Sequence, residues 1–148
     1  MNHAAARRER LARLLPEEGV DALFISNPVN VTYLTGFTGD SSTVVLTRDR
    51  VVLVSDPRYV GQIADECPEL ETHIRKPTTE IAEASADVLK KLGCRSVGFE
   101  SGAVTVAEFE QYKELAPAVA WRPAADRVER LRVVKDDDEL GRIRAAID

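Results

Sequence analysis

The residues of this sequence best suited to bind another molecule lie in the segment Asn27–Asp40. It carries two aromatic rings, Tyr33 and Phe37, and it ends in the carboxylate of Asp40. Nearly unbroken apolar runs flank the segment, the first of them at Val20–Ile25, which predicts buried strands on both sides. This much aromatic and apolar mass is unusual for a plain solvent loop, and loops fixed on a rigid scaffold often carry function. We therefore expect a structured turn that presents its rings and its carboxylate to a partner.

The sequence lacks the common patterns for catalysis within the chain itself. Gly-Asp-Ser-Ser at residues 39–42 is not the Gly-x-Ser-x-Gly turn that exposes a nucleophilic serine. No glycine-rich loop has the spacing that binds nucleotide phosphates. The two histidines, His3 and His73, have no carboxylate ligands at a recognisable spacing. We therefore assign no catalytic residue, no metal ligand and no cofactor to this chain.

Composition and charge restrict the class of protein. The chain has 148 residues, of which 44% are hydrophobic and 30% are charged, and this suits one globular domain with a sizeable core. The net charge of -5 argues against nucleic acid as the main partner. No stretch approaches the roughly 20 apolar residues that span a bilayer, and no apolar segment of a secretory signal follows the arginines near the N-terminus. We expect a cytoplasmic protein that binds neither nucleic acid nor membranes.

The two cysteines, Cys67 and Cys94, fit no metal-binding motif. A single pair in a chain without a secretory signal is typical of free thiols rather than of a disulfide. We expect two reduced thiols, and one intramolecular disulfide is the alternative.

The elements that must position the segment alternate between strands and helices. Strands are predicted at residues 20–25, 43–47, 51–55, 70–75, 95–100 and 119–122, and helices at 4–15, 56–67, 79–92, 104–116 and 125–134. The second and third strands flank Arg48-Asp49-Arg50 and therefore form a hairpin. Six strands interspersed with helices, with this one hairpin, predict an α/β fold with a mixed six-stranded sheet.

Polar residues and glycine predict the local shape of the segment after the first strand. Asn27 hydrogen-bonds its own backbone and shapes the turn before the proline that follows it. Asn30 caps the short helix that holds Tyr33. Gly36 ends this helix with a positive φ.

The helices outside this segment each show a cap or a buried side. Asp56 caps the helix after it and Thr79 caps the next one, which Gly93 ends. The predicted buried side of the helix after Asp56 consists of Tyr59, Val60, Ile63, Ala64 and Cys67. Near the N-terminus, leucines recur at helical spacing with arginines on the opposite face. This pattern favours a helix with a solvated face over a membrane anchor.

The last part of the sequence differs from the rest. An acidic run at residues 136–139 precedes apolar residues at helical spacing, and negative charge is favoured at a helix N-terminus. A calcium site is the alternative, but consecutive acids lack the alternate spacing of a calcium loop. We expect a domain at residues 1–132, followed at 133–148 by a linker and the start of the first helix of another domain.

Four motifs stand in order along the chain. They are Asn27-Pro-Val-Asn-Val-Thr-Tyr-Leu-Thr-Gly-Phe37, Asp56-Pro57-Arg58-Tyr59, Val97-Gly98-Phe99-Glu100, and Arg132 to Leu140 with Lys135 and Glu139. Together they resemble the signatures of the creatinase/prolidase amino-terminal domain, which precedes the catalytic domain of Xaa-Pro aminopeptidases, prolidases and creatinases. The first motif is fairly specific, and the other three gain weight from their order. This resemblance implies a ribonuclease H-like fold.

The resemblance also implies a function. The chain would be the non-catalytic domain of a metal-dependent Xaa-Pro aminopeptidase or dipeptidase. In the family, two divalent ions such as Mn²⁺, Co²⁺ or Zn²⁺ act in the carboxy-terminal catalytic domain, which this chain does not contain. The expected partners are that catalytic domain, a second subunit in a homodimer and a proline-containing peptide substrate. Two alternatives stay open: a creatinase-like amidinohydrolase, and a peptide- or protein-binding module of a catalytically inactive relative.

Four residues would contribute to a substrate pocket by the same resemblance. In relatives, the loop with the Tyr-Leu-Thr-Gly-Phe motif lies near the active site of a neighbouring subunit. Tyr33 and Phe37 would accordingly form apolar wall, with core packing as the alternative. Asp40 would bind the free amino terminus of a substrate, with a plain turn position as the alternative. Arg58 would pair with a carboxylate or steady the loop.

Overall fold

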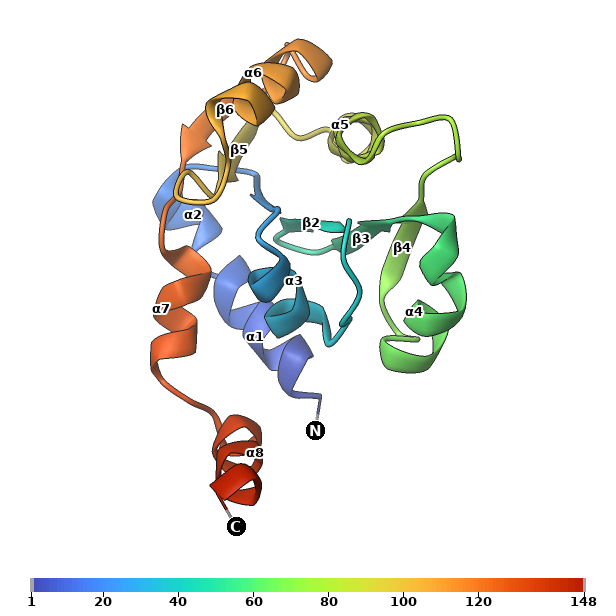
Figure 1. Cartoon of the computed structure of the whole chain (residues 1–148). Helices are drawn as coiled ribbons and strands as arrows, with labels where there is room; N and C mark the ends of the chain where they lie inside the picture. Colours follow the sequence, from blue (N-terminus) through green and yellow to red (C-terminus); the bar gives the residue numbers. More distant parts are fainter. Residues whose placement is uncertain (1, 148) are drawn as a thin grey trace.

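The computed structural model describes residues 2–147 as a sheet with helices on both sides (Figure 1). The strands are β1 (Ala22–Ile25), β2 (Thr43–Thr47), β3 (Val51–Ser55), β4 (Glu71–Ile74), β5 (Ser96–Phe99) and β6 (Ala120–Pro123). The helices are α1 (His3–Ala12), α2 (Leu15–Glu18), α3 (Pro28–Thr35), α4 (Val60–Glu66), α5 (Ile81–Lys91), α6 (Val106–Leu115), α7 (Arg127–Val133) and α8 (Asp137–Ile147). A 3-10 turn, η1 (Pro57–Tyr59), precedes α4. This order confirms the predicted alternation of strands and helices.

The six strands form one mixed sheet in the order β4-β3-β2-β1-β5-β6. β2 pairs antiparallel with β3, as the predicted hairpin, and also with β1, while the other neighbours are parallel. Gly98 of β5 lies opposite Leu23 of β1, and a Cβ atom at Gly98 would come within 2.6 Å of the Leu23 side chain. Glycine at this position therefore leaves room for the Leu23 side chain to pack over the strand. The mixed six-stranded sheet predicted from the sequence is confirmed.

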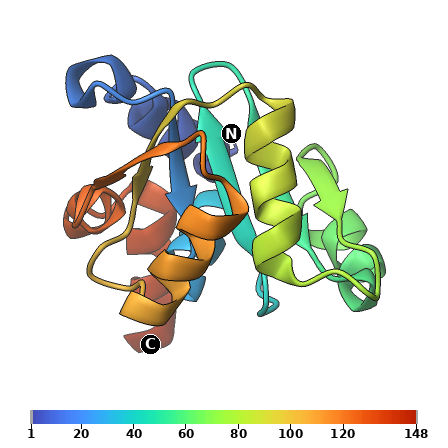
Figure 2. The ribbon, with the colours of Figure 1, turned by 90° about the horizontal axis from the view of Figure 1, so that it is seen from above.

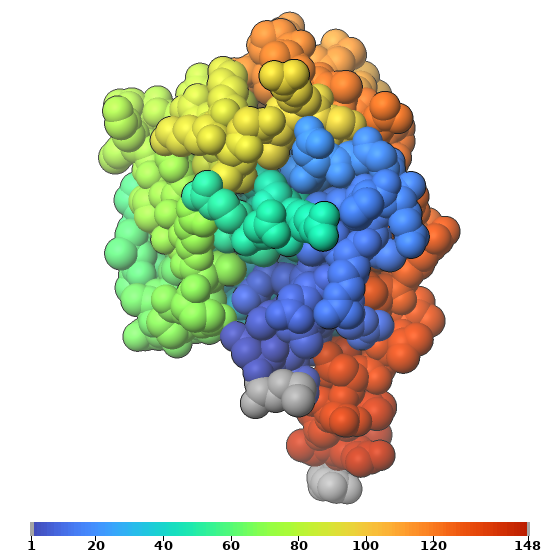
Figure 3. Space-filling model, turned by 180° about the vertical axis from the view of Figure 1, so that it is seen from behind, coloured from blue at the N-terminus to red at the C-terminus, as the bar shows by residue number. Residues whose placement is uncertain are grey.

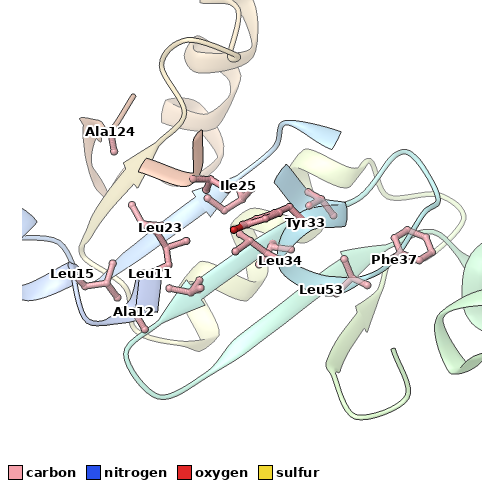
Figure 4. Packing of buried hydrophobic residues seen from close by; sticks show 14 of the residues in the cluster. Leu11, Ala12, Leu15, Leu23, Ile25, Tyr33, Leu34, Phe37, Leu53 and Ala124 are labelled. Carbon is pink, nitrogen blue, oxygen red and sulfur yellow. The ribbon is translucent and has the colours of Figure 1, made fainter. Parts of the chain in front are cut away.

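Two apolar cores cover the two faces of the sheet, because successive strand residues point to opposite sides. In β1, Leu23 and Ile25 belong to the core shared with α1, α3 and α7, and Ala22 and Phe24 belong to the core shared with α5 and α6. Figure 2 shows α5 and α6 packed side by side over the sheet. Figure 4 shows the opposite core around Leu23 and Ile25. The loops at the strand ends are thus attached to a scaffold that is packed on both faces.

The two cysteines lie in different cores. Cys67 packs on the side of α1 and α3, and Cys94 packs on the side of α5 and α6. Both are buried free thiols, and burial raises the pKa of each. The sheet therefore separates the two sulfur atoms.

The N-terminal helix differs from the prediction in its extent and in its polar face. α1 ends at Ala12, and a separate short helix begins at Leu15. Arg7 and Arg8 are buried, with exposed fractions of 9% and 8%, rather than solvated. Both guanidinium groups donate hydrogen bonds to backbone carbonyls of α3. The last carbonyls of a helix lack partners within it and accept such donors.

Two further local predictions are wrong. The buried side expected for α4 is right for Ile63 and Cys67, which are buried, and wrong for Val60 and Ala64, which are exposed. The cap of α5 is Glu80 rather than Thr79. Its carboxylate and that of a glutamate three residues later bind each other's backbone amides in a reciprocal capping box.

The acidic run marks a helix N-terminus, as predicted. The carboxylate of Asp136 accepts a hydrogen bond from the amide of Glu139 at 3.0 Å, and the Glu139 carboxylate accepts one from the amide of Asp136 at 3.0 Å. These two hydrogen bonds cap the N-terminus of α8. Within residues 2–147, no group of three or more side chains could bind a metal ion. In the same part of the chain, no helix is long and apolar enough to cross a membrane.

Candidate functional site

The turn after β1 is built around helix α3. The Asn27 side chain accepts a hydrogen bond from the amide of Val29, which caps the helix, and Pro28 takes its first position. Gly36 ends the helix at a φ of 81°, as predicted. The cap predicted from the sequence, Asn30, instead lies within the helix and is fully buried. That prediction is wrong because Asn27 already satisfies the first free amide.

Phe37 packs beneath the loop that follows α3. Its side chain is 0% exposed, and its ring meets that of Tyr59 edge-on with 5.3 Å between centroids. Gly39 passes so close that a Cβ atom there would lie 2.2 Å from the Phe37 ring. The amide and the hydroxyl of Thr38 both donate to the Glu66 carboxylate, at 2.8 and 2.6 Å. In this chain Phe37 is a packing residue, and its place in a substrate pocket stays a prediction.

Two of the four candidate residues, Asp40 and Arg58, meet around the Tyr59 ring. The hydroxyl of Tyr59 donates a short hydrogen bond to the Asp40 carboxylate, which lowers the pKa of Asp40 and raises the pKa of Tyr59. The guanidinium of Arg58 lies 5.4 Å from the Tyr59 ring centroid, and the Arg58 side chain is 68% exposed. Asp40 is exposed as well. The pair offers one negative and one positive group to solvent.

The Asp56 carboxylate holds the backbone and the side chain of Arg58 in place. The Asp56 carboxylate is 3% exposed and accepts hydrogen bonds from the Arg58 amide and from Arg58 Nε, both at 2.9 Å, and from Arg75. The hydrogen bonds from Arg58 lower the pKa of Asp56 to about 2. The capping role predicted for Asp56 is confirmed. An open groove of about 380 Å³ lies beside these side chains, and its wall includes Ser41 and Thr78.

Tyr33 lies apart from the other three candidates, as Figure 4 shows by its separation from Phe37. The guanidinium of Arg7 covers its ring at 4.3 Å from the centroid, and Arg7 Nη1 donates to the Tyr33 carbonyl oxygen at 3.1 Å. Burial and then the charge of Glu139 raise the pKa of Tyr33. Tyr33 therefore faces the start of α8, whereas the other three candidates lie together around Tyr59.

A buried polar network connects residues that are far apart in the sequence. The Glu100 carboxylate accepts hydrogen bonds from the two backbone amides after β1, at 2.8 and 2.7 Å, and from Asn30 Nδ2 at 2.5 Å. Asn30 also donates to Glu129 at 2.6 Å and accepts from Arg132 at 3.2 Å. Desolvation raises the pKa of Glu100. Residues of the first, third and fourth sequence motifs therefore meet in this network. In the sequence, only the order of the motifs along the chain connected them.

Comparison with known families agrees with this architecture. The creatinase/prolidase N-terminal domain matches residues 7–134, which include the first three motifs and the start of the fourth. The chain belongs to this family. The family match also covers every strand of the sheet and the whole polar network around Glu100.

Known relatives of this creatinase/prolidase N-terminal domain include two solved structures. The Xaa-Pro dipeptidase from Bacillus anthracis is 29% identical with a TM-score of 0.86, and the match covers 93% of this chain and 38% of that chain. The N-terminal domain of the cytoplasmic peptidase PepQ from Mycobacterium tuberculosis is 32% identical with a TM-score of 0.78, covering 86% of this chain and 98% of that one.

Among curated proteins, the uncharacterized peptidase YqhT from Bacillus subtilis is 29% identical over 132 residues, which make up 89% of this chain and 37% of that protein. The matches span 36–40% of the length of the curated relatives. The similarity therefore concerns one domain of proteins that are much longer.

Proposed function

We propose that this chain is the non-catalytic N-terminal domain of a metal-dependent Xaa-Pro aminopeptidase or dipeptidase. The match to the creatinase/prolidase N-terminal domain over residues 7–134 carries the proposal. The names of the solved relatives, an Xaa-Pro dipeptidase and the N-terminal domain of a peptidase, support it. The second relative is also described as cytoplasmic, which supports a cytoplasmic location.

The reaction would take place in a second domain that follows this one. Two divalent ions bound there, Mn²⁺, Co²⁺ or Zn²⁺, would supply an activated water and polarise the carbonyl before proline. Residues 2–147 offer these ions no cluster of ligands, so this domain would contribute shape and charge. Residues 133–148 would form the linker and the start of the next domain, and the position of α8 beyond the family match fits this division.

Asp40 and Arg58 are the residues that would reach the substrate pocket of a neighbouring subunit in a homodimer. Both are exposed, and both are fixed by contacts to Tyr59. A carboxylate suits the free amino terminus of a peptide, and a guanidinium suits a carboxylate. Phe37 would position the loop from below. Tyr33, in the last turn of α3, would act through its contact with Arg7.

A comparison of this chain with the complete protein tests the proposal. The complete protein should hydrolyse Xaa-Pro dipeptides in the presence of Mn²⁺. The 148-residue chain should show neither turnover nor stoichiometric binding of Mn²⁺, Co²⁺ or Zn²⁺ by calorimetry. Turnover by the isolated chain would contradict its non-catalytic role. Hydrolysis of creatine by the complete protein, or no hydrolysis of either substrate, would favour a creatinase or a binding module instead.

A further inference from the structure

Helix α8 is joined to the domain by few contacts. None of its residues 137–147 is buried, and it lies beyond the family match, which ends at residue 134. Figures 1 and 3 show it protruding from the body of the molecule next to the N-terminal helix. Val134, between α7 and α8, is extended at φ -91° and ψ 106°. The direction of α8 is therefore not dictated by a continuous helix, and side-chain contacts must set it.

Arg7 of α1 makes the main contact with the start of α8. Its Nε donates a hydrogen bond to Oδ2 of Asp136 at 2.8 Å, and its Nη2 lies 2.6 Å from the same oxygen. Carboxylate oxygens of Asp138 and Glu139 lie 3.9 and 3.7 Å from Nη2. Asp136 is also the residue that caps α8. Arg7 thus binds the helix at the point where it begins.

The same guanidinium group is bound to α3. Arg7 Nη1 donates to the carbonyl oxygen of Tyr33 at 3.1 Å, and the group lies over the Tyr33 ring at 4.3 Å from its centroid. The planar arrangement of donors in arginine lets one side chain stack on a ring and bind two acceptors, which a lysine ammonium does not reproduce. The Arg7 side chain is only 11% exposed, so water replaces these partners poorly.

Helix α7 does not depend on Arg7. Arg127 donates to Glu18 of α2 at 2.7 Å, and Arg132 donates to Asn30 of α3 at 3.2 Å. Val128 is buried in the core at 1% exposed. Loss of Arg7 should therefore release α8 while α7 and the sheet stay in place. This difference separates a positioning role from a general contribution to stability.

We propose that Arg7 is a positioning residue that couples the Tyr33 segment of α3 to the direction in which α8 leaves the domain. The coupling goes beyond the proposed peptidase function, because it rests on contacts within this chain alone. It can be tested whether or not the complete protein cleaves Xaa-Pro bonds. Where another domain follows α8, Arg7 would also set its angle to the sheet.

Pulsed electron paramagnetic resonance between two spin labels measures the direction of α8. Labels on Asp49→Cys and Ala145→Cys, both exposed positions, report the distance from the β2–β3 turn to α8, and the native thiols are buried. We expect a narrow distance distribution with Arg7 and Asp136 in place. Arg7→Met and Asp136→Asn should each abolish the narrow distribution, and the double variant should add nothing, since both remove one interaction.

The neighbouring carboxylate provides the matched control. Asp137→Asn changes the charge of the same helical turn at an exposed side chain, and it should leave the distribution narrow. Asp136→Asn should also shift the nuclear magnetic resonance signals of Tyr33, and Asp137→Asn should not. A narrow distribution in Arg7→Met or Asp136→Asn would overturn the proposal, even if the unfolding midpoint falls. Equal broadening by the two aspartate variants, or unshifted Tyr33 signals in Asp136→Asn, would overturn it as well.

Discussion

Replacement of Phe37 by alanine should destabilise the domain strongly. The ring is fully buried and meets Tyr59 edge-on. Emptied aromatic core sites cost about 3–5 kcal/mol of the free energy of unfolding, of which an aromatic contact contributes roughly 0.5–1.5 kcal/mol. Gly39, which passes over the ring, has no side chain to fill the space. We therefore expect a loss in the upper part of this range.

Urea unfolding followed by the fluorescence of the single tryptophan, Trp121, measures this loss as a lower midpoint at an unchanged slope. In a chain of this size each kcal/mol lowers Tm by about 2–4 °C, so a loss of about 4–5 kcal/mol should lower the melting temperature by roughly 8–20 °C. Val106→Ala is the control, because Val106 is 79% exposed and surface changes usually stay within about 0.5 kcal/mol. If Phe37→Ala does not fold, Phe37→Leu retains part of the apolar volume and keeps the transition measurable.

A loss below about 1 kcal/mol for Phe37→Ala would refute the reasoning, because a core position cannot be emptied at that cost. Phe37 would then face outward in solution, as a residue of a pocket wall would. A loss of the expected size assigns Phe37 to packing and leaves Asp40 and Arg58 as the exposed groups of the loop.

Three further results are expected. Asp56→Asn should lower the free energy of unfolding near pH 6. The difference in this free energy between wild type and variant should shrink as the pH falls from 3.8 towards about 2, because the native pKa of Asp56 is lowered. An equal difference at pH 6 and at pH 2, measured by urea unfolding, would contradict the ion pairs. Asn30→Ala should cost about 1–3 kcal/mol in urea unfolding, since Glu100 loses a buried donor; an unchanged midpoint would make the network dispensable. Cys67 and Cys94 should react slowly with a thiol reagent until the protein is denatured, and an intramolecular disulfide in protein purified without reductant would show the assignment to be wrong.

Local sequence patterns were sufficient to predict the sheet. Apolar runs and the charged turn Arg48-Asp49-Arg50 specify β2 and β3, because a hairpin depends on neighbouring residues. Gly36 and Gly93 end helices where the backbone adopts positive φ, and this preference is local as well. The cap of α5 was placed one residue early because threonine is a preferred residue type at this position, whereas the capping box in the structure is formed by Glu80.

Contacts between distant residues could not be predicted in the same way. Asn30 was predicted to cap α3, whereas its side chain donates a hydrogen bond to Glu100, which lies 70 residues away in the sequence. Arg7 was assigned to a solvated face, whereas it binds Asp136, 129 residues away. Nothing near either residue in the sequence records its partner, and burial of a polar side chain becomes favourable only after the fold supplies that partner. For the same reason the sequence did not separate Tyr33 from the other three candidates.

Steady-state hydrolysis of an Xaa-Pro dipeptide by the complete protein is the most direct test of the proposal that this domain shapes a substrate pocket. Asp40 and Asp49 are both exposed carboxylates that flank β2, one at each end. Asp40→Ala should lower kcat/KM with the subunits still associated, and Asp49→Ala should leave kcat/KM at the wild-type value. Equal kcat/KM for Asp40→Ala and wild type, or the same decrease in both variants, would contradict the proposed role of the loop.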